Sequence, residues 1–409
     1  MRISVDPVIG GRIKAAWAKL PPTKQAEIAP AILRAHQQAV TVTQTGKAPA
    51  DKAAPHHLVL AHSILSDDSD GVLSSLEAGI VIDVGADGVI WGTGKYEQLD
   101  PGWAEALAVF LETLLLGKHP FQVNPATIPM PDKVQIGLVG DWGTGDWRPQ
   151  PNLAPSTDVA SHMDFLKLDI TIHLGDVYYA GTGDQEQHNL LNIWPKGFIG
   201  SLALNSNHEM YSGAKPYFEA IAATQFGMQN GCSYFALENS NWVIVGLDSA
   251  YFSPESGLYM DGSLIPDGGV TQIIFLQAQV AKGKKVIVLT HHNGLSEDGS
   301  TTTNLWTQVM SGFAPGTGPN YWYWGHAHAG VVYKPYGPGA LCRCCGHGAL
   351  PWGQASALGS AANVGWYETR SARDPDIPQR VLNGFAVLRF DGPNLTETFY
   401  DENGGIAWQ

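Results

Sequence analysis

Charged residues are scarce in this chain of 409 residues. Asp, Glu, Lys and Arg make up only 15% of it, and 38 acidic residues against 24 basic ones give a formal net charge of −14. This balance argues against a broad basic face for nucleic acid or anionic lipid. An anionic substrate would therefore need a local source of positive charge.

Long hydrophobic runs are also missing from the sequence. No segment reaches the length of a membrane span, and the N-terminal stretch MRISVDPVIGGRIKAAWAKL has neither a continuous apolar core nor a signal-like cleavage pattern. We therefore expect a soluble protein without a membrane span, cytoplasmic or otherwise unexported as the sequence stands.

Cysteine is rare, with four residues, and three of them crowd into LCRCCGHG as Cys342, Cys344 and Cys345. Structural zinc sites usually pair two separated Cys or His elements, and a second element is lacking here. The pattern favours ordinary loop thiols or a single disulfide over a zinc site. The count does not resemble a disulfide-stapled secreted scaffold.

Glycine and proline, in contrast, are plentiful at 47 and 26 residues, and 44% of the chain is hydrophobic. A loop-rich protein with a sizeable core follows, long enough for two domains or for one domain with an extension. Residues 1–130 carry helical patterns at 26–40 and 99–118 and a hairpin pattern at 80–91, but no obvious chemistry. The four prolines of 119–133 suit a linker.

The pattern changes after this linker. Buried strands are predicted at 134–141, 169–176 and 284–292, helices at 157–168 and 270–283, and hairpins at 232–248 and 383–404. Strands that alternate with helices, with added hairpins, indicate an α/β fold with a mixed sheet system. We predict a mostly helical N-terminal region of unknown role over 1–130 and a catalytic domain over 131–409.

Residues able to bind a metal follow the strands. Because ligand sites of α/β sheets lie beyond the carboxyl ends of the strands, these residues can converge although they are distant in sequence. In the GHAH pair, alternation along an extended chain would bring both imidazoles to one side. The residues are Asp141 in GDWG, Asp176 and Tyr179 in GDVYY, Asn207 and His208 in NSNHE, His291 in VLTHH, and His326 and His328 in GHAH.

This ordered series resembles the five-block signature of the calcineurin-like metallophosphoesterases, and within that superfamily it is most similar to the purple acid phosphatases. GDWG has glycine where most of the superfamily has a metal-binding histidine, and GDVYY has the GDxxY form. The resemblance spans about residues 134–330. It implies a layered β-sandwich flanked by helices (αββα).

The resemblance also implies two metal ions. Asp141, Asp176, Tyr179 and His328 would hold ferric iron, and Asp176, Asn207, His291 and His326 would hold divalent zinc, iron or manganese. The residue types agree, since phenolate and carboxylates suit a trivalent metal and nitrogen ligands suit a divalent one. Tyr178 adjoins Tyr179, but the GDxxY spacing favours Tyr179.

The activity implied is hydrolysis of phosphate monoesters by attack of metal-bound hydroxide, with a small-molecule ester as substrate. His208 is the best candidate to stabilise the transition state or to protonate the leaving alkoxide. His292, beside His291, would either touch the substrate or support the ligand shell. Both roles of His292 stay open.

We expect other roles for several residues near these blocks. Ser206 stands where the family has the glycine of GNHE, and it would be strained if the turn needs positive φ. Structural roles are expected for Asp146, His188 and Asp248. Whether the tryptophans wall the pocket or fill the core stays open; they are Trp142, Trp147, Trp322 and Trp324.

Two other functions compete with the phosphomonoesterase. One is a metallophosphodiesterase that acts on cyclic nucleotides or phospholipids with a non-iron metal pair, because the motifs scarcely separate mono- from diesterases. The other is a non-catalytic binding or scaffold protein in which residues 1–130 do the work. No protein partner is indicated by the sequence.

Overall fold

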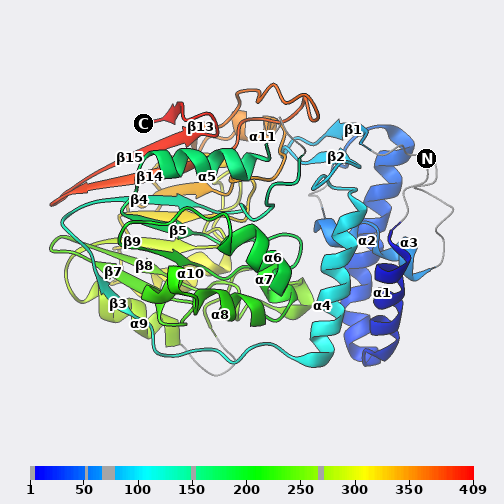
Figure 1. The fold of residues 1–409 in the computed structure, drawn as a ribbon, viewed down its shortest axis with the longest axis horizontal. Helices are drawn as coiled ribbons and strands as arrows, with labels where there is room; N and C mark the ends of the chain where they lie inside the picture. Colours follow the sequence, from blue (N-terminus) through cyan, green and yellow to red (C-terminus); the bar gives the residue numbers. More distant parts are fainter. Residues whose placement is uncertain (1–4, 51–53, 67–78, 149–152, 266–270) are drawn as a thin grey trace.

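The computed structural model describes residues 5–50, 54–66, 79–148, 153–265 and 271–409 (Figure 1). Two mixed β-sheets form its centre. The six-stranded sheet runs in the order β16-β15-β14-β4-β5-β6, and the eight-stranded sheet runs in the order β13-β11-β12-β10-β9-β8-β7-β3.

The strands of the six-stranded sheet are β4 (Lys133–Val139), β5 (Ile170–His173), β6 (Gly200–Ala203), β14 (Gly384–Asp391), β15 (Asn394–Asp401) and β16 (Ile406–Trp408). Those of the eight-stranded sheet are β3 (Thr127–Pro129), β7 (Phe235–Glu238), β8 (Trp242–Gly246), β9 (Lys285–Thr290), β10 (Tyr321–Trp324), β11 (Gly330–Tyr333), β12 (Leu341–Cys345) and β13 (Val364–Tyr367). In the first sheet β4, β5 and β6 are parallel, and in the second β8, β9, β10 and β12 are parallel. Their carboxyl ends therefore gather at one edge of each sheet.

The two sheets pack face to face over an apolar core. Alternate residues of β4 and β5 point into it, among them Ile136 and Ile172, and they meet Ile244 and Leu289 of the eight-stranded sheet. Val139 belongs to the core on the opposite face of the six-stranded sheet. Successive side chains of a strand point to opposite faces of the sheet, so a strand that is buried on both faces contributes alternate residues to two cores.

Helices cover the outer faces of both sheets. α5 (Pro155–Phe165) packs on the six-stranded sheet through Val159 and Met163, and α9 (Thr271–Val280) and α10 (Asn304–Met310) pack on the eight-stranded sheet through Leu276 and Leu305. The predicted class, an αββα sandwich with a largely helical N-terminal region, is confirmed.

The N-terminal region lies against one side of the sandwich (Figure 1). Its elements are α1 (Pro7–Lys19), α2 (Pro22–Thr45), the short helix η1 (His56–Leu58), α3 (Ala61–Leu65), the hairpin β1 (Val81–Val84) and β2 (Ile90–Gly92), η2 (Pro101–Trp103) and α4 (Ala104–Leu116). Asp100 caps η2, since its Oδ1 accepts the Gly102 N–H at 2.8 Å. Gly117 ends α4 at a φ of 76°, which glycine adopts without strain.

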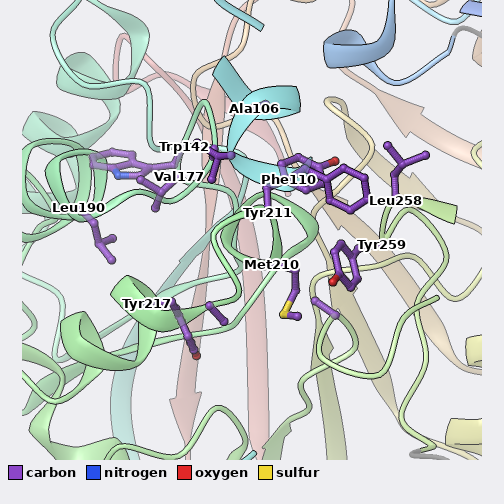
Figure 2. Packing of buried hydrophobic residues seen from close by; sticks show 14 of the residues in the cluster. Ala106, Phe110, Trp142, Val177, Leu190, Met210, Tyr211, Tyr217, Leu258 and Tyr259 are labelled. Carbon is purple, nitrogen blue, oxygen red and sulfur yellow. The ribbon is translucent and has the colours of Figure 1, made fainter. Parts of the chain in front are cut away.

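One apolar core joins this region to the sandwich. Phe110 of α4 lies edge-on to Tyr211 and Tyr259, with ring centroids 5.9 and 6.0 Å apart (Figure 2). The same cluster reaches Ile13 of α1 and Val139 of β4. The region is therefore packed against the sandwich through buried side chains.

The remaining helical segments lie in the connections between strands. They are α6 (Gly183–Gln185), η3 (Glu186–Leu191), α7 (Asn207–Tyr211), α8 (Lys215–Ile221), η4 (Thr224–Gln229), η5 (Glu255–Gly257) and α11 (Ser356–Gly359). Cys342, Cys344 and Cys345 lie in β12 as buried free thiols, so the expectation of loop thiols or a disulfide is corrected. Burial raises the pKa of Cys342 to about 12.

Candidate metal centre

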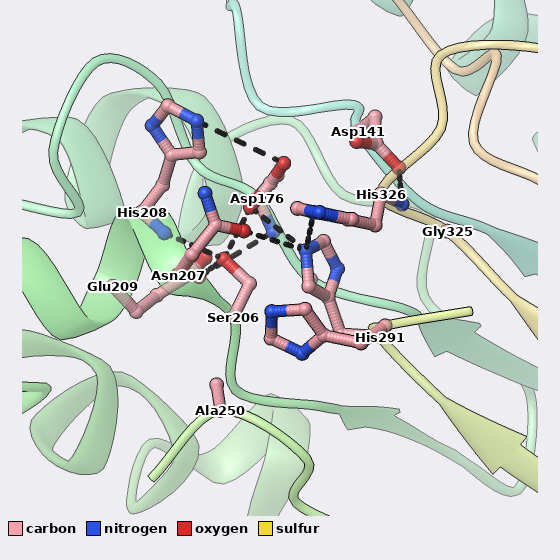
Figure 3. Close-up of polar contacts among 12 residues, drawn as sticks. Asp141, Asp176, Ser206, Asn207, His208, Glu209, Ala250, His291, Gly325 and His326 are labelled. Carbon is pink, nitrogen blue, oxygen red and sulfur yellow. Dashed lines mark hydrogen bonds and ion pairs between the residues drawn. The ribbon is translucent and has the colours of Figure 1, made fainter. Parts of the chain in front are cut away.

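The predicted residues converge where the two sheets present their carboxyl ends. Asp141 follows β4 and Asp176 follows β5, while His291 follows β9 and His326 follows β10. Figure 3 shows these side chains pointing toward one another from both sheets. Ligand atoms of Asp141, Asp176 and His291 all lie within 4.8 Å of one another.

Asp141 joins the first group of candidate ligands. Its Oδ1 lies 3.2 Å from His328 Nε2 and accepts the Tyr178 hydroxyl at 3.1 Å. Its Oδ2 accepts the backbone N–H of His326 at 2.7 Å. The side chain is fully buried, so its orientation is fixed from three directions.

Asp176 stands between the first group and a second one. Its Oδ2 accepts the Tyr178 hydroxyl at 2.8 Å, and its Oδ1 lies 3.3 Å from His291 Nε2. His291 Nε2 in turn lies 2.8 Å from Asn207 Oδ1 and 3.2 Å from His326 Nδ1. The carboxylate can thus reach two adjacent positions, which is the geometry of a bridging ligand.

The contacts of His291 show why a cation fits this place. Its Nδ1 lies 2.9 Å from the Leu174 carbonyl oxygen, and an N–H must donate there because a carbonyl only accepts. In the neutral ring Nε2 then carries a lone pair, and it faces the oxygens of Asn207 and Asp176. Lone pairs that converge at such short distances are the arrangement of ligands around a metal ion.

The charge of the cluster also favours a bound cation. Asp141 and Asp176 are buried together, and among the described residues no lysine or arginine pairs with either carboxylate. Burial and the charge of Asp176 raise the pKa of Asp141 well above its ordinary value. The donor set suits positively charged metal ions.

Tyr178, and not Tyr179, belongs to this cluster. The Tyr178 hydroxyl touches Asp141, Asp176 and, at 3.0 Å, His328 Nε2. The Tyr179 hydroxyl instead donates to Asp100 Oδ2 at 2.7 Å, on the N-terminal region. The GDxxY spacing indicates Tyr179, but the phenol that the structure places at the cluster is that of Tyr178, one residue earlier.

The backbone is left-handed at three residues of the cluster. Asp141, Asp176 and His326 have φ values of 55°, 75° and 63°. Such angles are uncommon for residues other than glycine and concentrate at functional sites, where surrounding contacts hold them. The chain accepts local strain here in order to aim these side chains inward.

Ser206 causes no such strain. Its φ is −138°, which is extended backbone, and its hydroxyl accepts the His208 N–H at 3.1 Å as the cap of α7. The hydroxyl also bonds Asp176 and Glu209 (Figure 3). The departure from the family's glycine is thus compatible with the presentation of Asn207.

His208 and His292 have different surroundings. His208 Nδ1 lies 2.6 Å from the Tyr179 carbonyl oxygen, and its Nε2 is 4.0 Å from Asp176 Oδ2 at the edge of the pocket. His292 has both ring nitrogens engaged, by the Ser249 hydroxyl at 2.9 Å and by the Tyr259 carbonyl oxygen at 2.7 Å. Burial lowers the pKa of His292 to about 3. His292 therefore fits the supporting role and His208 the substrate-facing one.

A pocket of about 490 Å³ opens over the cluster. Its walls include residues of the N-terminal region that no motif indicates, above all His56 and His57, whose only signal is their adjacency. None of the described residues that line it is lysine or arginine. The lining comprises Asp176, Asn207, His208, His326 and His328 on the metal side, with Pro49, Ala50, Ala54, Pro55, His56, His57, Ala86, Asp87, Val89, Gln98, Tyr211, Met260, Asn293, Ser296, Glu297, Asp298, Ala327, Ala329, Val331, Tyr333, Trp352, Ala357 and Leu358 around them.

The other residues considered near the motifs have structural positions. Asp248 accepts the N–H groups of Ala250 and Tyr251, and His188 is exposed, with Nδ1 on the Asp184 carbonyl oxygen. Asp146 is exposed and faces the Ala154 N–H at 3.4 Å. Trp142, Trp322 and Trp324 are fully buried, and Trp147 packs beside Tyr96; the tryptophan that lines the pocket is Trp352.

No protein-family model and no curated protein matches the chain. Among solved structures, a purple acid phosphatase from yellow lupin (Lupinus luteus) seeds aligns at 14% identity and a TM-score of 0.47, over 69% of this chain and 54% of that one. GAP50, the anchor in the inner membrane complex of Plasmodium, aligns at 12% identity and a TM-score of 0.46, over 68% of this chain and 87% of that one. A protein assigned as a 5′-nucleotidase from Staphylococcus aureus aligns at 10% identity and a TM-score of 0.36, over 68% of this chain and 53% of that one.

The lupin protein is a purple acid phosphatase, the family that the sequence motifs resemble. The chain spans only about half the length of the lupin and staphylococcal proteins. Within the part of the chain that the structure describes, no helix is long and apolar enough to cross a membrane.

Proposed function

We propose that the protein is a dinuclear metal-dependent hydrolase of phosphate monoesters, of the purple acid phosphatase type. The observation that carries the proposal is the convergence of carboxylate, phenol, amide and imidazole groups on two adjacent positions that share Asp176. This is the donor set expected from the sequence motifs, with Tyr178 in place of Tyr179.

The first position would be held by Asp141, Asp176, Tyr178 and His328, and the second by Asp176, Asn207, His291 and His326. Oxygen donors dominate the first and suit ferric iron, while nitrogen donors dominate the second and suit divalent zinc, iron or manganese. When bound, the two ions supply positive charge that holds the phosphate and makes water a strong nucleophile.

The protein's own groups then orient the ester. His208 donates Nδ1–H to the Tyr179 carbonyl oxygen, which turns Nε2 toward the pocket. Protonated at Nε2, as acid solution favours, the ring can donate to the leaving oxygen. Ser249 and the Tyr259 carbonyl oxygen hold His292, whose ring lies 4.9 Å from that of His291 and limits its movement.

The test measures metal content and hydrolysis of p-nitrophenyl phosphate by the purified, metal-loaded protein. We expect two metal ions per chain. Replacement of Asn207 or His291 by alanine should lower kcat/KM at least about 100-fold, because each removes a ligand from the second position. His188→Ala, an exposed histidine outside the cluster, is the matched control and should change nothing.

The result that contradicts the proposal is undiminished turnover in Asn207→Ala or His291→Ala. Parallel assays with bis(p-nitrophenyl) phosphate separate the two phosphoesterase alternatives, since a diesterase would show the higher kcat/KM on the diester. A metal-loaded protein that hydrolyses neither ester would favour the binding or scaffold protein.

A further inference from the structure

The N-terminal region contributes a histidine to the wall of the pocket. His56 begins η1, and its ring centroid lies 5.7 Å from that of His328 and 4.7 Å from that of Trp103. It lines the same pocket as Asp176, Asn207 and His208. A residue more than 80 positions before the first motif thus faces the candidate metal centre.

The ring of His56 is not fully hydrogen-bonded. Its Nδ1 is buried without a hydrogen-bond partner among the described residues. Buried polar groups are normally paired. Because the ring borders the pocket, its other nitrogen, Nε2, is the one that can donate a hydrogen bond to a ligand there.

The composition of the pocket makes such a donor useful. A phosphate group that contacts two metal ions still exposes oxygens toward the opposite wall, and that wall has no lysine or arginine among its described residues. It carries the carboxylates of Asp87, Glu297 and Asp298, which repel a phosphate. An imidazole N–H is the kind of donor that remains for these oxygens.

We propose that His56 is a substrate-positioning residue, whose ring N–H donates to a phosphate oxygen of an ester held at the metal centre. This inference rests on the proposed function, and it assigns part of the substrate site to residues outside the catalytic sandwich. Pro55 and the packing of His56 against Trp103 fix the direction from which the ring approaches.

The experiment compares three variants with the parent protein: His56→Ala, His56→Gln, whose amide N–H restores a donor, and the control His62→Ala. His62 lies in the same region and also has a buried, unpartnered Nδ1, but its ring centroid lies 4.3 Å from that of His36 and it does not line the pocket. Each metal-loaded protein is assayed for metal content, for KM and kcat on p-nitrophenyl phosphate, and for inorganic phosphate binding by calorimetry.

We expect His56→Ala to raise both KM and the Kd for inorganic phosphate by about tenfold, the effect of one hydrogen bond to a charged group. Metal content should stay at the parent value, His56→Gln should recover part of the loss, and His62→Ala should match the parent. Unchanged KM and Kd in His56→Ala would overturn the proposal. A loss of metal in that variant would overturn it too, because the residue would then act through folding.

The proposed function and the role of His56 can be refuted separately. If the parent protein hydrolyses no ester, the proposed function is wrong, yet weaker phosphate binding by His56→Ala would still support the role of this residue. If the parent protein is active and His56→Ala matches it in every assay, the role of His56 alone is refuted.

Discussion

Two adjacent tyrosines show how much a single residue decides in this centre. Tyr178 turns its hydroxyl to Asp141 and Asp176, whereas Tyr179 turns its hydroxyl to Asp100. A phenolate bound to ferric iron gives a visible charge-transfer band, so the two tyrosines can be distinguished by absorption.

We expect Tyr178→Phe to abolish this band in the iron-loaded protein, and Tyr179→Phe to retain it. The reason is that only the Tyr178 oxygen lies within reach of the first metal position. The measurement is the visible spectrum together with the iron content of both variants. A band that survives in Tyr178→Phe and vanishes in Tyr179→Phe would return the ligand to the residue that the GDxxY spacing indicates.

Sequence spacing predicted most of the cluster because its residues directly follow buried strands. Asp141 and His291 needed only the rule that parallel strands end at one edge. The choice between Tyr178 and Tyr179 depends on the path of the loop that follows β5, which no alternation pattern encodes. The position of His56 could not be predicted from the sequence, because it depends on how a separate helical region packs on the sandwich.

At the level of elements, the turn between β2 and η2 contains an acid in an unfavourable setting. Glu97 is 3% exposed, and its Oε2 accepts the Gly94 N–H at 2.8 Å. Burial, aided by the charge of Asp100, raises the pKa of Glu97 to about 7 from an ordinary 4.5. The folded turn therefore holds a proton that the unfolded chain releases.

The buried Glu97 in this turn makes the stability of the folded protein depend on pH. Between pH 4.5 and 7 the folded state binds more protons at Glu97 than the unfolded state, so stability falls as pH rises through this range. We expect Glu97→Gln, which has no proton to lose, to gain on the order of 2 kcal/mol over the parent between pH 5 and pH 8. Thermal unfolding at both pH values measures it, and a gap that stays constant with pH would argue against the buried acid.

At the scale of the whole molecule, the division at residue 130 remains a prediction. Phe110 and Leu107 of the N-terminal region share one core with Met210 and Tyr211 of the sandwich. Each large side chain that loses such burial costs about 1.5–3 kcal/mol, and whole domains are stable by only about 5–15 kcal/mol.

We therefore expect a fragment of residues 126–409 to lack cooperative unfolding and to bind metal poorly, although it contains every candidate ligand. Differential scanning calorimetry of the fragment beside the full chain measures this. A fragment with a sharp transition and two bound metals would instead establish the sandwich as an independent domain.

The overall architecture was open to prediction where local signals were strong. Asp100, Pro101 and Gly117 marked the ends of the segment that contains α4, and the apolar runs before Asp141 and Asp176 marked β4 and β5. The four prolines of 119–133 predict a linker, but the structure has the short strand β3 within this segment. Pairing with β7 made it a strand, and that is a tertiary event.

The candidate ligands come from both sheets of the sandwich, with Asp141 and Asp176 on one and His291, His326 and His328 on the other. A metal ion bound by ligands from both sheets would link the two sheets, which otherwise contact each other through side-chain packing. Since a ligand that binds only the native state adds its binding free energy to folding, part of the protein's resistance to unfolding would be set by the metal supply around it. Metal starvation would then deplete the protein itself as well as its activity.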